Sequence, residues 1–265
     1  MSQTFDELGV SEPVIEALAG GGIAEPFRIQ SLVIPDARVA AAEHVRFDAP
    51  FKFYRDEPRT LRLEAWLFPD GNDVIAECRL IGERRLAGRA EPQRTVHFTG
   101  RLRLTAAGVH AALAIAAQPP RPDGPPSVGA AEIYRTYFHG PAYQVLDGVW
   151  ASERAALGSM AEHLPPDAAG AAMVLDPRRM ELCFQTAGIW DIQTHGGRLA
   201  LPREIDEVQW NGGAAHGPVV ACVHARDDGR FDAEVLDAAG APYLIMRGYQ
   251  TIAVDPGAAG GSGAR

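Results

Sequence analysis

Residues 173–197 combine a helical apolar pattern with two polar side chains that could act on one bound group. Glu181 and Gln185 stand four residues apart, and in a helix this spacing places both on one face. A carboxyl beside an apolar stripe is a candidate general acid, because partial burial favours the protonated form that can give up a proton. The alternative is an ordinary amphipathic helix with Glu181 on its solvated edge.

The same segment carries the signals that begin and end a helix. Asp176 is a good N-cap residue, and Pro177 suits the first helical position. Gly196 or Gly197 can end the helix in a left-handed conformation. The sequence therefore predicts one long helix with an apolar stripe at helical spacing, made of Met180, Cys183, Phe184, Ala187 and Trp190.

The first part of the chain is rich in strand patterns. Apolar and polar residues alternate over 61–67, 74–80 and 96–104, and the turn 69–72 separates the first two stretches. Alternation of this kind predicts half-buried antiparallel strands joined by hairpins. A short helix near 13–19 and a strand near 27–34 are expected before them.

The second part repeats this plan around the long helix. We expect a short helix at 130–138 and a strand within 140–150 ahead of it. Turns at Asp228-Gly229 and Ala239-Gly240 fit hairpins between later strands. These later strands are predicted at 199–210, 218–226, 230–236 and 243–254.

A proline-rich segment divides the two parts. Residues 118–128 contain five prolines, which exclude a helix or a central strand. The predicted organisation is an N-terminal unit at 1–117 with a degenerate start, a linker at 118–128, a C-terminal unit at 129–254 and a disordered tail at 255–265. The fold class is α+β, with two antiparallel sheets that are each wrapped round a helix.

Composition narrows the classes of function. A net charge of −9 and a pI near 5.4 argue against nucleic acid as a partner, because an acidic surface repels phosphate. Three cysteines without a Cys-x-x-Cys pair predict neither a disulfide framework nor a zinc site. With no apolar run long enough for a membrane helix and no leader pattern, we expect a cytoplasmic protein.

Several motifs together resemble the dehydratase domains of polyketide synthases and polyunsaturated-fatty-acid synthases. The family pattern His-Pro-Ala-Leu-Leu-Asp-x-x-x-Gln is similar to residues 176–185, and Tyr-Gly-Pro-x-Phe-Gln is similar to residues 139–144. Weaker likeness lies at Val149-Trp150, at Leu201-Pro202 with Ile205 and Val208, at residues 45–50 and at residues 97–100.

The resemblance implies a double hotdog fold that removes water from a β-hydroxyacyl chain on the phosphopantetheine arm of an acyl carrier protein. In the family a histidine from the first half takes the α-proton and a carboxyl on the second-half helix protonates the departing hydroxyl. No cofactor or metal is implied. The carrier protein and flanking synthase domains are the expected partners, with a homodimer by analogy. The implied catalytic residues are Glu181, Gln185 and His139, and the implied substrate-binding residues are Gly140, Pro141, Tyr143 and Pro177.

The chain differs from the family at the positions of the histidine and the aspartate that the family uses in catalysis. The pattern His-x-x-x-Gly-x-x-x-x-Pro is absent from the N-terminal part, where the first histidine is His44. Glu181 stands where the family has Asp, and Asp176 where it often has His. General base assistance contributes a factor of roughly 10² to 10⁴ in rate. Loss of the histidine base is therefore expected to reduce the rate more than replacement of the acidic Asp by Glu. We therefore predict a non-catalytic domain that binds acyl groups or carrier protein, or that serves as a structural platform.

Two structural outcomes separate the hypotheses. The non-catalytic interpretation expects no histidine paired with Glu181. The alternative, an active dehydratase or isomerase with a relocated base, expects the imidazole of His139 or His44 within a few ångström of Glu181, facing an open tunnel. A hotdog thioesterase or product-shaping domain would need another polar constellation, which the sequence lacks. The remaining histidines are expected to be structural or exposed: His97, His110, His163, His195, His216 and His224.

Overall fold

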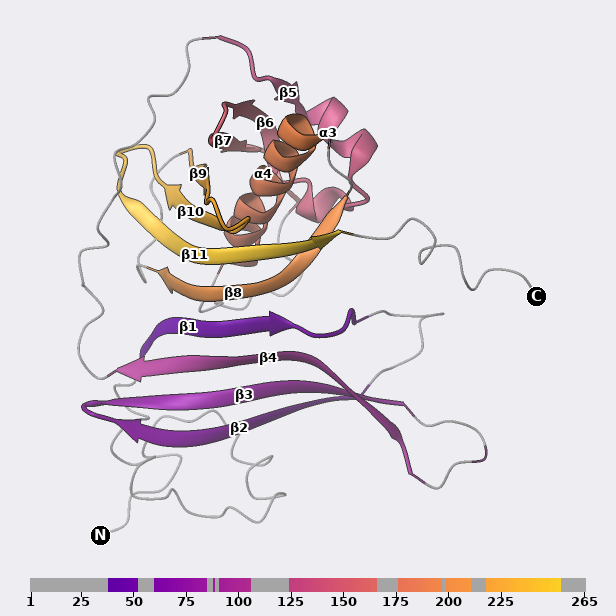
Figure 1. Cartoon of the computed structure of the whole chain (residues 1–265), viewed down its shortest axis with the longest axis vertical. Helices are drawn as coiled ribbons and strands as arrows, with labels where there is room; N and C mark the ends of the chain where they lie inside the picture. The colour runs from indigo at the N-terminus through magenta and orange to yellow at the C-terminus, as the bar shows by residue number, and fades with distance from the viewer. Residues whose placement is uncertain are drawn as a thin grey trace.

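The computed structural model describes residues 38–51, 60–84, 88, 91–105, 124–165, 176–196, 199–210 and 218–253. These residues form one eleven-stranded antiparallel sheet in the order β2-β3-β4-β1-β8-β11-β10-β9-β7-β6-β5 (Figure 1). The first half of the sheet contains β1 (Arg38–Phe47), β2 (Thr60–Asp70), β3 (Asp73–Arg84) and β4 (Gln93–Thr105). The second half contains β5 (Val128–Gly129), β6 (Leu146–Ala151), β7 (Ala155–Met160), β8 (Ala200–Trp210), β9 (Val220–Ala225), β10 (Phe231–Leu236) and β11 (Pro242–Ala253).

The two halves meet edge to edge between β1 and β8. Ala42 pairs with Val208, and Val45 pairs with Ile205. Strands distant in the sequence thus share one hydrogen-bonded ladder, so the two predicted sheets are joined into a continuous one. The strand expected within 140–150 is in fact the short 3-10 helix η1 (Pro141–Tyr143) followed by β6, because Gly140 and Pro141 turn the chain first.

A central helix fills the curve of the second half. The helix α4 (Pro177–His195) contacts β9, β7, β6 and β10, and α3 (Ala130–Thr136) lies beside it (Figure 1). Asp176 caps α4, with its side chain accepting a hydrogen bond from the Arg178 backbone, and Gly196 ends it in the left-handed conformation. The start and end signals of this helix are therefore confirmed.

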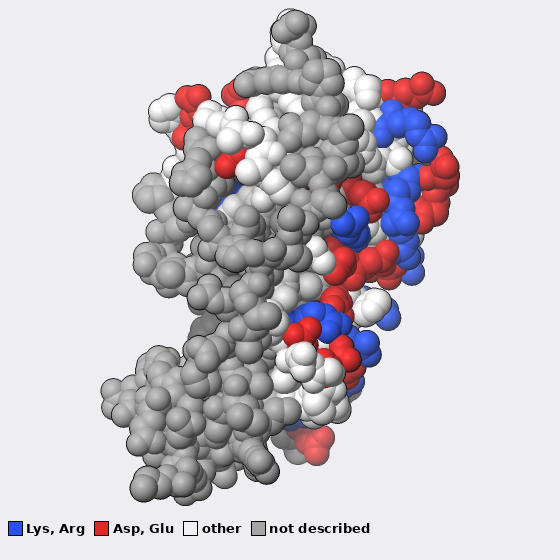
Figure 2. All heavy atoms as spheres, turned by 90° about the vertical axis from the view of Figure 1, so that its left-hand side faces the viewer, with Lys and Arg blue, Asp and Glu red and all other residues white. Residues whose placement is uncertain are grey.

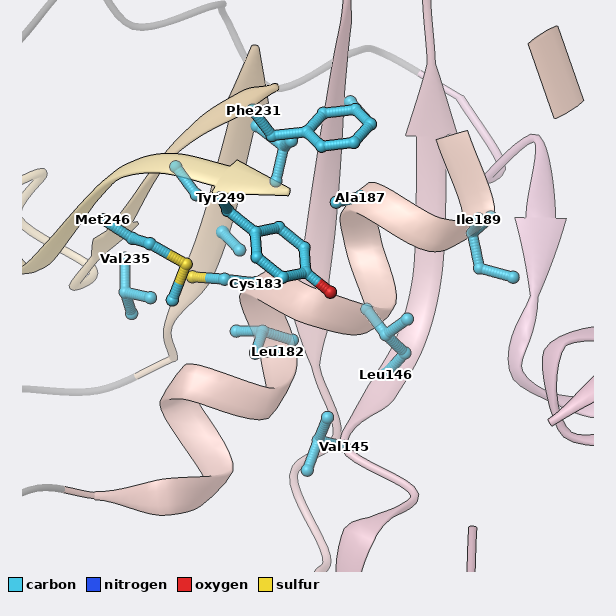
Figure 3. Close-up of a cluster of buried hydrophobic side chains, with 14 of the residues drawn as sticks. Val145, Leu146, Leu182, Cys183, Ala187, Ile189, Phe231, Val235, Met246 and Tyr249 are labelled. Atoms are coloured by element: carbon cyan, nitrogen blue, oxygen red, sulfur yellow. The ribbon is translucent and has the colours of Figure 1, made fainter. Parts of the chain in front are cut away.

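The buried face of α4 is wider than the predicted stripe. Leu182, Thr186 and Ile189 are also buried, whereas Met180 and Phe184 are only partly so. The reason is that strands surround the helix on several sides, and an enclosed helix is apolar over most of its circumference. Figure 3 shows Tyr249 reaching from β11 towards α4 beside Cys183 and Ala187.

The predicted half-burial of the strand at 61–67 is wrong. Leu63 is 69% exposed, and almost every residue of β2 is exposed, because β2 is the edge strand and pairs only with β3. The segments 13–19 and 27–34, most of the linker and the tail at 255–265 lie outside the described residues. The last linker residues are described, and they lead into β5 and pack on β6, where Trp150 donates to the Gly124 carbonyl.

Ion pairs cross the strands on the solvent side of both halves. Arg103 of β4 lies 2.7 Å from Glu43 of β1, and Arg230 lies 2.7 Å from Glu204 of β8. Figure 2 accordingly shows acidic and basic side chains intermixed along one side of the molecule. None of the described helices is long and apolar enough to cross a membrane, and no cluster of metal-ligating side chains occurs among the same residues.

Candidate active site

The fold brings His139 and Glu181 together. Nε2 of His139 lies 3.0 Å from Oε1 of Glu181, and the two side chains are 21% and 20% exposed. The structural expectation of the non-catalytic interpretation, that no imidazole pairs with Glu181, is therefore wrong. The contact could not be predicted from the sequence, because His139 and Glu181 belong to different elements. They meet only through the packing of the α3–η1 segment on α4.

His139 is held by its neighbours in the α3–η1 segment. Its ring stacks on the Phe138 ring at a centroid distance of 5.1 Å. The ring of Tyr137 lies nearly perpendicular to the ring of His139. The side chain of Gln144 donates to the His139 carbonyl at 3.0 Å, and the Tyr143 backbone donates to that of Gly140. The predicted motif residues thus shape the loop that presents the histidine.

Gln185 is the centre of a buried hydrogen-bond chain. The Leu146 backbone N–H donates to the Tyr134 hydroxyl at 2.6 Å, and that hydroxyl donates to Gln185 Oε1 at 2.9 Å. The Gln185 amide nitrogen donates to the Tyr143 carbonyl at 2.9 Å and to Glu181 Oε1 at 3.0 Å. Every polar atom of this 2%-exposed side chain has a partner, which fixes its orientation.

His139 and Glu181 open into a small pocket of about 100 Å³ that is lined by both apolar and polar side chains. Gly188 lets the Tyr137 hydroxyl approach α4 closely, because a Cβ at Gly188 would lie 2.2 Å from that hydroxyl. His139, Glu181 and Gln185 line the pocket together with Tyr137, Phe138, Phe184, Gly188, Leu199, Ala200, Leu201, Pro202, Tyr249 and Thr251.

The tyrosines round the carboxyl stay neutral hydroxyl groups. Burial raises the pKa of Tyr134 to about 12, with a smaller contribution from the Glu181 charge. Burial, again assisted by Glu181, raises the pKa of Tyr137 and of Tyr249 above the usual tyrosine range. Tyr134 and Tyr137 donate hydrogen bonds to Gln185, and none of the three tyrosines is an acid near neutral pH.

The other predicted residues lie nearby without lining the pocket. Gly140 and Pro141 begin η1, and Pro177 begins α4. Tyr143 contributes its backbone carbonyl to Gln185. His44 is not part of the pocket: it is exposed on β1, at a bulge where its φ is 50°.

Sequence reasoning missed Tyr134, Tyr137 and Tyr249. No spacing rule connects a tyrosine on α3 or β11 with a glutamine on α4. One signal was present for His139, since it occupies the place of the tyrosine in the family's Tyr-Gly-Pro pattern.

A larger pocket of about 490 Å³ lies at the C-terminal end of α4. Its ionisable groups are mostly engaged with each other: His195 lies 3.1 Å from Asp191, and Arg230 is held by Glu204 and Asp206. We place the chemistry in the smaller pocket, because polar groups converge there on a carboxyl with a free oxygen.

An antiparallel sheet that curls round a central helix defines the hotdog class of proteins. A family model described as the polyketide synthase dehydratase N-terminal domain matches residues 112–260, more than half of the chain. The chain therefore belongs to the polyketide synthase dehydratase family. The matched residues are mainly the second half of this chain, although the description says N-terminal. A search of curated proteins found no match.

Solved structures agree on the fold. The dehydratase domain from the CurF module of curacin polyketide synthase is similar with a TM-score of 0.67 at 18% identity, covering 91% of this chain and 83% of that one. A trans-AT polyketide synthase dehydratase domain from Brevibacillus brevis gives 0.62 at 19% identity, covering 91% and 83%. The CurK dehydratase domain gives 0.61 at 16% identity, covering 92% and 83%. The predicted double hotdog fold is confirmed.

Proposed function

We propose that this domain is an active dehydratase that removes water from a β-hydroxyacyl thioester. The observation that carries the proposal is the 3.0 Å contact between His139 and Glu181 at a pocket. Removing water from such a thioester needs one group that accepts a proton from the α-carbon and one that protonates the departing hydroxyl. An imidazole and a carboxyl side by side supply groups able to accept and to donate protons.

The relatives support a requirement for this pair of groups. CurK dehydratase with an aspartate replaced by asparagine is described as inactive, and so is the same protein with a histidine replaced by phenylalanine. In this chain Glu181 would take the part of the aspartate. His139 would take the part of the histidine, although it comes from the second half.

The substrate would arrive on the phosphopantetheine arm of an acyl carrier protein, without a cofactor bound to this domain. The carrier protein and neighbouring domains of a polyketide or polyunsaturated-fatty-acid synthase are the proposed partners. The apolar side chains round the pocket, such as Leu201 and Phe184, suit an acyl chain.

The second candidate is a non-catalytic domain that binds acyl groups or carrier protein. The observation that favours it is the absence of a histidine before His44, where the family places its base. This candidate expects the His139–Glu181 contact to be purely structural.

Turnover of β-hydroxybutyryl-N-acetylcysteamine thioester by the wild type and by Glu181→Gln decides between them. We expect a loss of roughly 10² to 10⁴ in kcat/KM for Glu181→Gln, with an unchanged Tm. Glu132→Gln, on the exposed side of α3, is the matched control and should keep wild-type activity. Absence of turnover by the wild type, also with the substrate on a carrier protein, would establish the non-catalytic candidate.

A further inference from the structure

The hydrogen bonds round Glu181 leave only one of its two oxygens available to a substrate. Oε1 accepts from Gln185 Nε2 at 3.0 Å and lies 3.0 Å from His139 Nε2. Among the described residues, no donor contacts Oε2, and Oε2 is not one of the buried atoms without a partner. Because Glu181 lines the pocket, Oε2 is the oxygen that faces it.

The orientation of Gln185 makes Glu181 Oε1 a hydrogen-bond acceptor. The Tyr134 hydroxyl uses its single proton on Gln185 Oε1, because it already accepts from the Leu146 N–H. At the other end of the side chain the Tyr143 carbonyl can only accept, so the amide nitrogen must face it. The remaining N–H then points at Glu181 Oε1, to which it donates at 3.0 Å.

His139 has no ring nitrogen free for the substrate. Nε2 already lies against Glu181, and Nδ1 is buried without a hydrogen-bond partner. A proton on Nε2 fits this arrangement, because Glu181 Oε1 can accept it, whereas a proton on the buried Nδ1 would have no acceptor among the described residues. The histidine thereby becomes a second donor to Oε1.

We propose that Glu181 Oε2 performs both proton transfers of the reaction, while His139, Tyr134 and Gln185 are positioning residues that hold the carboxylate. This inference rests on the proposed dehydratase function and changes its mechanism, because the histidine is no longer the base. Both steps occur on neighbouring carbons of the substrate, within reach of one carboxyl oxygen.

The steps balance without a further reactant. Oε2 takes the proton from the α-carbon, and the electron pair of that C–H bond becomes the enolate of the thioester. The enolate electrons then form the α,β double bond as the β-carbon–oxygen bond breaks. The departing oxygen takes the proton from Oε2 and leaves as water, and Glu181 returns to its carboxylate form.

Replacement of the histidine by a side chain that keeps only the donor tests the assignment. In His139→Gln the side-chain amide can place an N–H near the position of Nε2, yet it cannot act as a base. We expect kcat/KM to fall less than tenfold in His139→Gln and by at least a hundredfold in Glu181→Gln. His139→Phe, which removes the donor, should fall between them. Equal, severe losses in His139→Gln and Glu181→Gln, with both variants folded by their Tm, would overturn the single-carboxyl mechanism and leave the dehydratase proposal standing.

The pH profile of the wild type gives a test that needs no variant. One carboxylate predicts a single limb, with kcat/KM lost as the pH falls, whereas a separate base and acid give a bell-shaped profile. Burial raises the pKa of Cys183, Tyr134, Tyr137 and Tyr249, so these groups near Glu181 do not add a limb near neutral pH. A descending limb between pH 6 and 9 would contradict the proposal, and a wild type without turnover would remove its basis.

Discussion

The two halves of the sheet share a strand plan but differ in what their side chains do. The main core cluster consists almost entirely of second-half residues, and Ala42, at 7% exposure, is its one buried member from the first-half strands among the described residues. Cross-strand ion pairs occur in both halves, whereas the exposed edge strand β2 belongs to the first half. Among the described residues, both the main core cluster and the candidate chemistry are therefore concentrated in the second half.

The strongest test of this asymmetry removes the polar centre of the second half. Gln185→Leu leaves Tyr134, the Tyr143 carbonyl and Glu181 without their shared partner. Each buried group left unsatisfied costs about 1–3 kcal/mol, so we expect a loss of about 3 kcal/mol or more in the free energy of unfolding, measured with urea. Gln93→Leu, exposed on β4, should change it by less than about 0.5 kcal/mol. Similar losses of stability in both variants would contradict the asymmetry between the two halves.

A matched pair of glycines compares the packing of the halves. A Cβ on Gly158 of β7 would lie 2.1 Å from Thr186 Oγ1 and 2.8 Å from Leu146. Overpacking of this kind costs about 1–3 kcal/mol, so Gly158→Ala should lower the Tm clearly. A Cβ on Gly100 of β4 meets Val45 at an ordinary 3.5 Å, and Gly100→Ala should leave the Tm unchanged or slightly raised. A reversed order of the two Tm values would show that the first half is the more tightly packed.

The smallest effect is expected from the ion pairs of the first half. Arg103 contacts Glu43, Asp70 and Asp73 at 2.7, 2.8 and 3.3 Å, with its own side chain 30% exposed. Exposed pairs contribute about 0–1 kcal/mol, so Arg103→Met should lower the free energy of unfolding by less than about 1 kcal/mol. The difference from wild type should shrink at 1 M salt, where screening is stronger. A larger and salt-independent loss would identify this cluster as part of the stabilising core.

Local signals predicted the elements better than the contacts between them. Asp176, Pro177 and Gly196 defined α4 almost to the residue, because caps act within one turn. The exposure of β2 was not predictable, since alternation records the pattern of a strand and not whether anything covers it. The Glu181–Gln185 pair followed from helical spacing, whereas the contact with His139 depends on tertiary packing that no local pattern encodes.

The seam between β1 and β8 bears on any attempt to divide the protein. Cutting the chain in the linker would strip β8 of its ladder partner and expose the backbone N–H and C=O groups of residues now paired with β1. An unpaired edge is a template for another strand. The isolated C-terminal portion would therefore tend to join a second copy of itself along β8, so that self-association follows from the loss of a neighbour within the same molecule.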